Sequence, residues 1–95
     1  MPKKLALSEA EIKLVRGILA GFKFRFFVLG SRAIGNPKPF SDLDLYSPDE
    51  IPLEIVSKIR EAFDESNLPF TVDLILKRDC SAEFLEKIRD QLIAV

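Results

Sequence analysis

The sequence contains no histidine and only one cysteine, Cys80. Without histidine, the chain cannot build a Ser-His-Asp or Cys-His nucleophile pair, a zinc site with histidine ligands, or an imidazole acid or base. A single cysteine excludes an internal disulfide and is typical of a reducing compartment, so we expect the protein in the cytoplasm. Any catalysis must therefore depend on carboxylates, lysines or a bound metal ion.

Long hydrophobic runs are also missing, since none approaches the roughly 18 apolar residues that a membrane span requires. The 95 residues are 47% hydrophobic and 31% charged, which is enough for one globular core and too little for two. The composition therefore predicts a single domain over residues 1–95, with no membrane partner.

Charge is nearly balanced over the whole chain but not along it. The net charge of −1 argues against general binding of nucleic acid. Residues 1–40 hold eight Lys/Arg and two Glu, a net charge of +6, whereas residues 41–95 hold six Lys/Arg and thirteen Asp/Glu, a net charge of −7. This distribution permits an anion-binding first part beside a cation-binding second part, although two mixed, solvated surfaces would give the same numbers.

Hydrophobic periodicity predicts alternating helices and strands. Ser8 and Glu11 have the spacing of a capping box at the start of a helix that ends near Gly21. From Phe22 the period changes to two, which predicts a strand up to Gly30. The remaining predicted elements are a strand over 42–46, a helix after Pro52, a strand over 70–76, and a last helix capped by Asp79 or Ser81. Three strands with helices packed on them make a small α+β layer structure.

Two aspartates, Asp42 and Asp44, share one face of the short alternating strand predicted over residues 42–46. Two residues apart on a strand, their side chains leave the same face about 6.5–7 Å apart at the backbone. Like charges this close raise one another's pKa unless a cation or solvent compensates, and oxygen ligands of this kind suit Mg²⁺. A solvated strand end would also explain an isolated pair of aspartates.

A third carboxylate, Asp73, stands where an apolar residue would pack better in the strand 70–76. A buried unpaired charge is costly, so this side chain should lie near water or a cation. If its strand lies beside that of Asp42 and Asp44, three carboxylates converge on one patch. No histidine is available to neutralise such a patch, which favours a divalent cation.

Gly30-Ser31 follows a predicted strand directly. A glycine and a serine at this point allow backbone N–H groups and a hydroxyl to approach an anion closely, and Arg32 could add a charge-assisted hydrogen bond. Taken alone, the dipeptide is also typical of an ordinary turn. A phosphate-binding turn together with three carboxylates supplies the parts of metal-assisted phosphoryl or nucleotidyl transfer.

Three stretches of the chain together resemble the DNA polymerase beta-like nucleotidyltransferase superfamily. They are Gly30-Ser31-Arg32-Ala33 after a hydrophobic strand, Ser41-Asp42-Leu43-Asp44-Leu45, and Val72-Asp73-Leu74-Ile75. The short length makes the chain similar in particular to a minimal nucleotidyltransferase (MNT) domain. The resemblance covers residues 22–76 and implies a small mixed three-stranded sheet with helices packed on it, as in the polymerase beta palm.

The resemblance also implies roles for individual residues. Gly30 and Ser31 would hold the β- and γ-phosphates of ATP or another nucleoside triphosphate, and Arg32 would support the turn or a phosphate. Asp42 and Asp44 would bind two Mg²⁺ ions. Asp73 would complete the metal site and help to deprotonate the attacking hydroxyl, so that the three aspartates are both the catalytic and the metal-binding residues.

Minimal members of the superfamily act as antitoxins encoded beside a helical HEPN ribonuclease toxin, and some transfer AMP from ATP to that toxin. We therefore expect Mg²⁺-dependent transfer of AMP to a hydroxyl of a partner HEPN toxin. The loop over residues 36–40 is less basic here than in many relatives, and no acceptor-binding domain is evident. We expect a partner protein or a second copy of the chain to supply the missing acceptor-binding surface.

Two alternatives stay open at this point. The protein could be a non-catalytic antitoxin that neutralises its partner by complex formation alone. It could also be a transferase that acts on a small molecule or an RNA end. Cys80 has no base near it in the sequence, and we interpret it as an unreactive residue.

Overall fold

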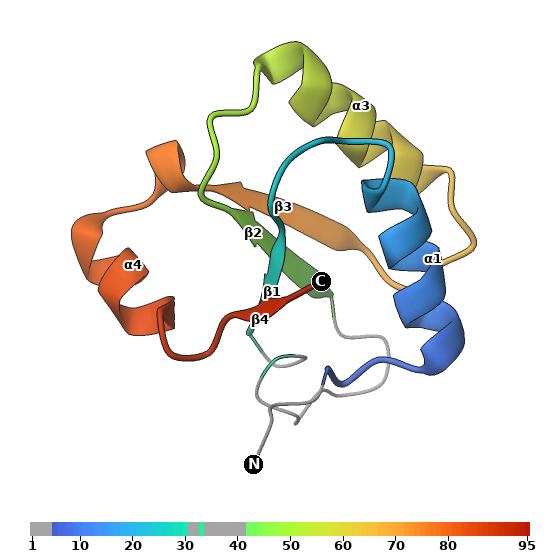
Figure 1. The fold of residues 1–95 in the computed structure, drawn as a ribbon, viewed down its shortest axis with the longest axis horizontal. Coiled ribbons are helices and arrows are strands. Elements are labelled where there is room, and N and C mark those ends of the chain that lie inside the picture. The colour runs from blue at the N-terminus through green and yellow to red at the C-terminus, as the bar shows by residue number, and fades with distance from the viewer. Residues whose placement is uncertain (1–4, 31–32, 34–41) are drawn as a thin grey trace.

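The computed structural model describes residues 5–30, 33 and 42–95 (Figure 1). Its elements are α1 (Glu9–Leu19), β1 (Phe27–Leu29), β2 (Leu43–Ser47), α3 (Leu53–Asp64), β3 (Val72–Leu76), the 3-10 turn η1 (Lys77–Asp79), α4 (Ala82–Ile88) and β4 (Ile93–Ala94). These residues confirm the predicted α+β class. None of their helices has the length and apolar character needed to cross a bilayer.

The strands form one mixed sheet in the order β3-β2-β1-β4. β2 and β3 are parallel and are connected by α3, the kind of crossover that parallel neighbours require. β1 runs antiparallel to both β2 and β4. The described sheet thus has four strands, and the expected three is wrong because the two-residue β4 is too short to show a period.

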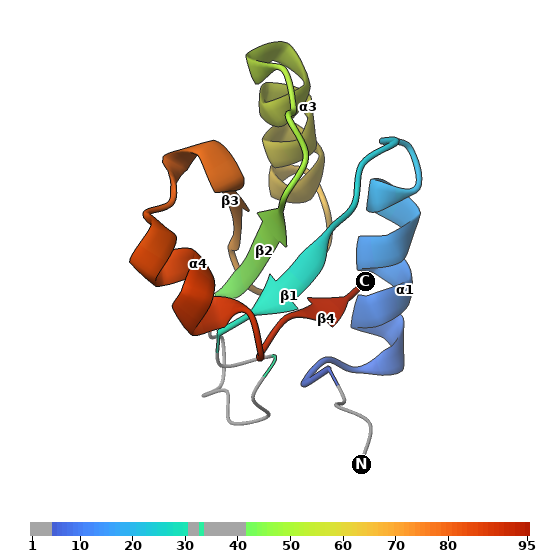
Figure 2. The same cartoon turned by 60° about the vertical axis from the view of Figure 1, so that its left-hand side comes forward.

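The helices cover both faces of the sheet (Figure 2). α1 and α3 pack on one face, where they bury the main hydrophobic core, and α4 lies on the other face. Because side chains alternate along a strand, Leu43 and Leu45 of β2 enter the main core while Tyr46 packs in the smaller cluster beneath α4. Asp44 lies between the two leucines and therefore projects to the α4 side.

Helix starts follow the expected capping chemistry. The Ser8 hydroxyl accepts a hydrogen bond from the Glu11 N–H at 3.1 Å, and the Glu11 carboxylate accepts one from the Ser8 N–H at 2.9 Å. The predicted capping box is therefore confirmed. At α4, Ser81 and not Asp79 is the N-cap, and its hydroxyl accepts the Phe84 N–H.

The strand predicted from Phe22 begins only at Phe27. The apolar face of residues 22–28 is as predicted, because its alternating side chains all contact the main core. Residues 22–26 do not join the strand, because the Arg25 backbone N–H donates to the Asp49 carboxylate at 2.7 Å and not to a carbonyl oxygen of a neighbouring strand. The Arg25 guanidinium also donates to that carboxylate, at 3.1 and 2.6 Å.

Candidate active site

β3, which carries Asp73, lies beside β2, which carries Asp44, as the convergence of the three carboxylates on one patch requires. In the parallel register of β2 and β3, Asp44 is the direct partner of Asp73. Adjacent strands are about 4.8 Å apart, so these two side chains start from neighbouring positions on the α4 side of the sheet. Asp42 precedes β2 by one residue. Asp44 is half-buried, whereas Asp42 and Asp73 are exposed.

These carboxylates affect one another electrostatically. Burial raises the pKa of Asp44 above its ordinary value, and the negative charges of Asp73 and then Asp42 raise it further. No Lys or Arg forms an ion pair with them within the described ranges. Within the same ranges, no three His, Cys, Asp or Glu side chains are already gathered closely enough to hold a metal ion. The metal-ligand role of the three aspartates therefore stays a prediction.

Gly30 lies next to the Asp44 carboxylate. It follows β1 directly and has a φ of +80°, a conformation that L side chains rarely adopt. A Cβ atom at this position would lie 2.8 Å from Asp44 Oδ2, which is closer than real contacts allow. The backbone thus approaches the Asp44 carboxylate as only a glycine can. Ser31 and Arg32, the other predicted nucleotide-binding residues, and the loop over 36–40 lie outside the described residues.

Comparison with known proteins decides the family. No protein-family model matches the chain. A protein described as a probable protein adenylyltransferase, MntA, from Haemophilus influenzae is 34% identical over 96 residues, which cover 97% of this chain and 84% of that protein. The chain belongs to the nucleotidyltransferase superfamily. It is an enzyme of that class, which uses a nucleoside triphosphate as its substrate.

One residue that contacts the candidate site of this nucleotidyltransferase escaped the sequence analysis. The Gly30 N–H donates a hydrogen bond to Gln91 Oε1 at 2.8 Å, across 61 residues of sequence. The Gly30 N–H is therefore already partnered, whereas the sequence analysis expected backbone N–H groups at Gly30-Ser31 to be available to an anion. The only sequence signal is that Gln91 is the sole glutamine of the chain. No periodicity could have placed it, because its position depends on the pairing of β4 with β1.

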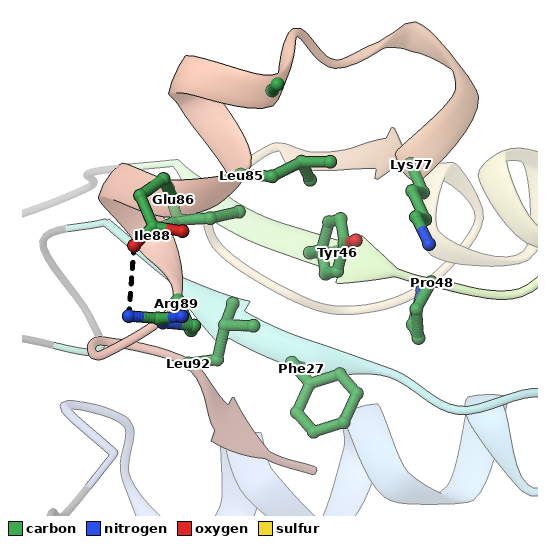
Figure 3. A pocket seen from close by; sticks show the side chains of 10 residues that line it. Phe27, Tyr46, Pro48, Lys77, Leu85, Glu86, Ile88, Arg89 and Leu92 are labelled. Atoms are coloured by element: carbon green, nitrogen blue, oxygen red, sulfur yellow. Dashed lines mark ion pairs between the residues drawn. The ribbon is translucent and has the colours of Figure 1, made fainter.

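An apolar pocket of about 440 Å³ lies on the same side of the nucleotidyltransferase sheet (Figure 3). Phe27 and Tyr46 line it from the sheet, and Leu85 and Leu92 line it from α4 and the segment after it. Tyr46 is two residues beyond Asp44 on β2, so the pocket and the carboxylates occupy successive positions along one sheet face. Its volume falls within the range of small-ligand sites.

Cys80 has no feature of a reactive thiol. Burial raises its pKa above the ordinary value, and the nearby Asp79 raises it further. The thiol contacts the Leu76 carbonyl oxygen at 3.2 Å as a hydrogen-bond donor. Because the thiolate is the nucleophilic form, these surroundings agree with the interpretation of Cys80 as unreactive.

Proposed function

We propose that this nucleotidyltransferase transfers AMP from ATP to a hydroxyl group of a partner protein in a Mg²⁺-dependent reaction. The observation that carries the proposal is the pairing of Asp44 with Asp73 beside Gly30, where the lack of a side chain lets the backbone approach the Asp44 carboxylate. The printed name of the Haemophilus relative, a protein adenylyltransferase, supports both AMP and a protein acceptor.

The donor set suits Mg²⁺. Asp42, Asp44 and Asp73 offer oxygen ligands only. The pKa of Asp44 is raised first by burial and then by the negative charges of Asp73 and Asp42, and no Lys or Arg pairs with these carboxylates among the described residues. These three residues would hold the metal. When bound, Mg²⁺ neutralises negative charge on the phosphates and on the attacking and leaving oxygens.

The chain's own residues then orient the reactants. Gly30 brings the backbone close to the Asp44 carboxylate. Ser31 and Arg32 follow Gly30 in the sequence and would donate hydrogen bonds to the phosphates. The acceptor oxygen forms a bond to the α-phosphorus while the bond to the β-phosphate oxygen breaks and pyrophosphate leaves. The hydroxyl proton passes to the carboxylate of Asp73, the exposed member of the pair.

The biological partner in this proposal is a HEPN-type ribonuclease toxin, which the protein would silence in the cytoplasm. The resemblance of the Gly30-Ser31 and Asp42/Asp44 motifs to minimal nucleotidyltransferases supports this antitoxin role. The toxin, or a second copy of this chain, would supply the surface that binds the acceptor.

The test uses ATP labelled on the α-phosphate, Mg²⁺ and lysate of the source organism. We expect one labelled protein with the wild type, and none with Asp44→Asn, with Asp73→Asn or after chelation of Mg²⁺. Asp64→Asn is the matched control, because Asp64 is an exposed aspartate at the end of α3 whose loss should leave labelling unchanged.

Each other outcome changes the proposal in a defined way. Label on RNA or on a small molecule would keep the chemistry and replace the acceptor. Absence of label, together with a stable complex between this chain and a partner, would indicate a non-catalytic antitoxin. Undiminished labelling by the Asp44→Asn enzyme would show that the carboxylates are not the catalytic site.

A further inference from the structure

We propose that Gln91 is a positioning residue that fixes the glycine turn of the nucleotide site without touching the nucleotide. The inference rests on the proposed function of that site. Its basis is the hydrogen bond from the Gly30 N–H to Gln91 Oε1, at 2.8 Å in partly buried surroundings.

The β1–β4 pairing explains why Gln91 can reach Gly30. In the antiparallel register, Phe27 pairs with Ala94 and Val28 with Ile93. Two residues further along β1, the same register places Gly30 opposite Gln91. The regular strand pairing has already ended there, so the side-chain amide takes the place of a backbone carbonyl and satisfies the Gly30 N–H.

The second peptide group of Gly30 is also held. Its carbonyl accepts the N–H of Ala33 at 3.0 Å, and Ala33 is buried, with 5% of its surface exposed. Gly30 is thus held through both of its peptide groups, by buried Ala33 at its carbonyl and by Gln91 at its N–H. Any rotation of the Leu29–Gly30 peptide would shift the Gly30 α-carbon, and a Cβ atom built on it would lie only 2.8 Å from Asp44 Oδ2. Gln91 therefore controls the spacing between the turn and the carboxylates.

A competing interpretation predicts the opposite result. Gln91 could be a placeholder that releases the Gly30 N–H when a phosphate arrives. In that case removal of the amide would improve ATP binding, because the N–H would already be available. A positioning residue gives weaker ATP binding when it is removed, because the turn loses its fixed geometry.

The experiment compares the wild type with Gln91→Met, which keeps the length of the side chain but has no comparable acceptor. Amide hydrogen exchange at Gly30, followed by NMR, should become roughly 3- to 10-fold faster, as the loss of one hydrogen bond predicts. The dissociation constant for Mg²⁺-ATP and the KM for ATP should rise by a similar factor, and kcat should change less. Val28, a buried residue of the same strand, should keep its exchange rate.

Two further variants separate positioning from general damage to the fold. Gln91→Glu retains a side-chain acceptor and should restore slow exchange at Gly30. Lys87→Met, at an exposed position of α4, is the control for the methionine itself and should behave as the wild type.

Unchanged Gly30 exchange in Gln91→Met, or tighter ATP binding by this variant, would overturn the inference. A wild-type protein that binds ATP but transfers nothing would overturn the proposed function alone, because the exchange rate and ATP affinity still test Gln91. A wild-type protein that does not bind ATP would overturn both.

Discussion

Substitution of Gly30 by alanine tests the close approach between the glycine turn and the carboxylates. The added methyl group meets two obstacles, because the φ of +80° is unfavourable for an L residue and the new Cβ would lie 2.8 Å from Asp44 Oδ2. The backbone strain alone costs about 1–2 kcal/mol. The contact adds to this cost, because the Asp44 carboxylate must move away from its position beside Asp73.

We therefore expect Gly30→Ala to lower the free energy of unfolding by about 2 kcal/mol, within the usual range for strained backbone positions. For a domain of this size, 1 kcal/mol corresponds to about 4–8 °C in Tm, so Tm should fall by roughly 8–16 °C. Nucleotide transfer should fall as well, because the substitution displaces Asp44.

The matched control is Gly17→Ala. Gly17 lies inside α1, and a Cβ added there meets no atom within 4 Å. Alanine in a helix interior is about 0.8–1 kcal/mol more favourable than glycine, so this variant should raise Tm by roughly 4–8 °C. The same chemical change should thus have opposite effects at the two positions, as measured by thermal unfolding followed by circular dichroism.

A double-mutant cycle separates strain from contact. In an Asp44→Ala background the carboxylate is gone, so Gly30→Ala should cost only the backbone strain. A Gly30→Ala protein with wild-type Tm and full transfer activity would refute the reasoning. If Gly30→Ala lowers the free energy of unfolding equally in the wild-type and Asp44→Ala backgrounds, the contact with Asp44 contributes nothing and backbone strain alone explains the loss.

The other predictions concern pH and the core. The raised pKa of Asp44 means that the folded state binds the proton of this carboxyl more tightly than the unfolded state does. The stability that the protonated carboxyl contributes is therefore lost as pH rises through the folded pKa. Asp44→Asn should therefore unfold at a higher Tm than the metal-free wild type at neutral pH, and an equal or lower Tm would contradict this. The hydrogen bonds from Arg25 lower the pKa of Asp49, so their stabilisation is present above the ordinary carboxyl range and is lost on acidification. Melts of Asp49→Asn at successive pH values should show its Tm deficit closing as pH falls, and a deficit constant with pH would count against the ion pair. Ile59→Ala should cost about 2–5 kcal/mol in urea unfolding, because Ile59 is fully buried in α3, and a loss below 1 kcal/mol would mean that the core collapses around the gap.

Local chemistry made much of the fold predictable. The Ser8–Glu11 capping box marked the start of α1, because its hydrogen bonds involve residues three positions apart. The alternation around Asp44 predicted β2 and the face to which this carboxylate projects. In each case the determining interactions lie within a few residues, where a sequence pattern can express them.

Long-range partners were harder to predict. Asp49 holds Arg25 from 24 residues away and thereby moves the start of β1, although the hydrophobic pattern runs on through Phe24. The contact of Gln91 with Gly30 spans 61 residues and depends on a two-residue strand. Interactions of this kind are set by the assembled sheet, so no local period indicates them.

The half-buried position of Asp44 between like charges has an evolutionary consequence. Replacement of this carboxylate by a neutral amide would remove the proposed metal ligand and, in the same step, relieve an electrostatic cost to the fold. Descendants that lose the chemistry would therefore keep a well-folded surface for binding a partner. Selection for stability alone would favour that loss, so the acidic group is expected to persist only where nucleotide transfer itself is under selection.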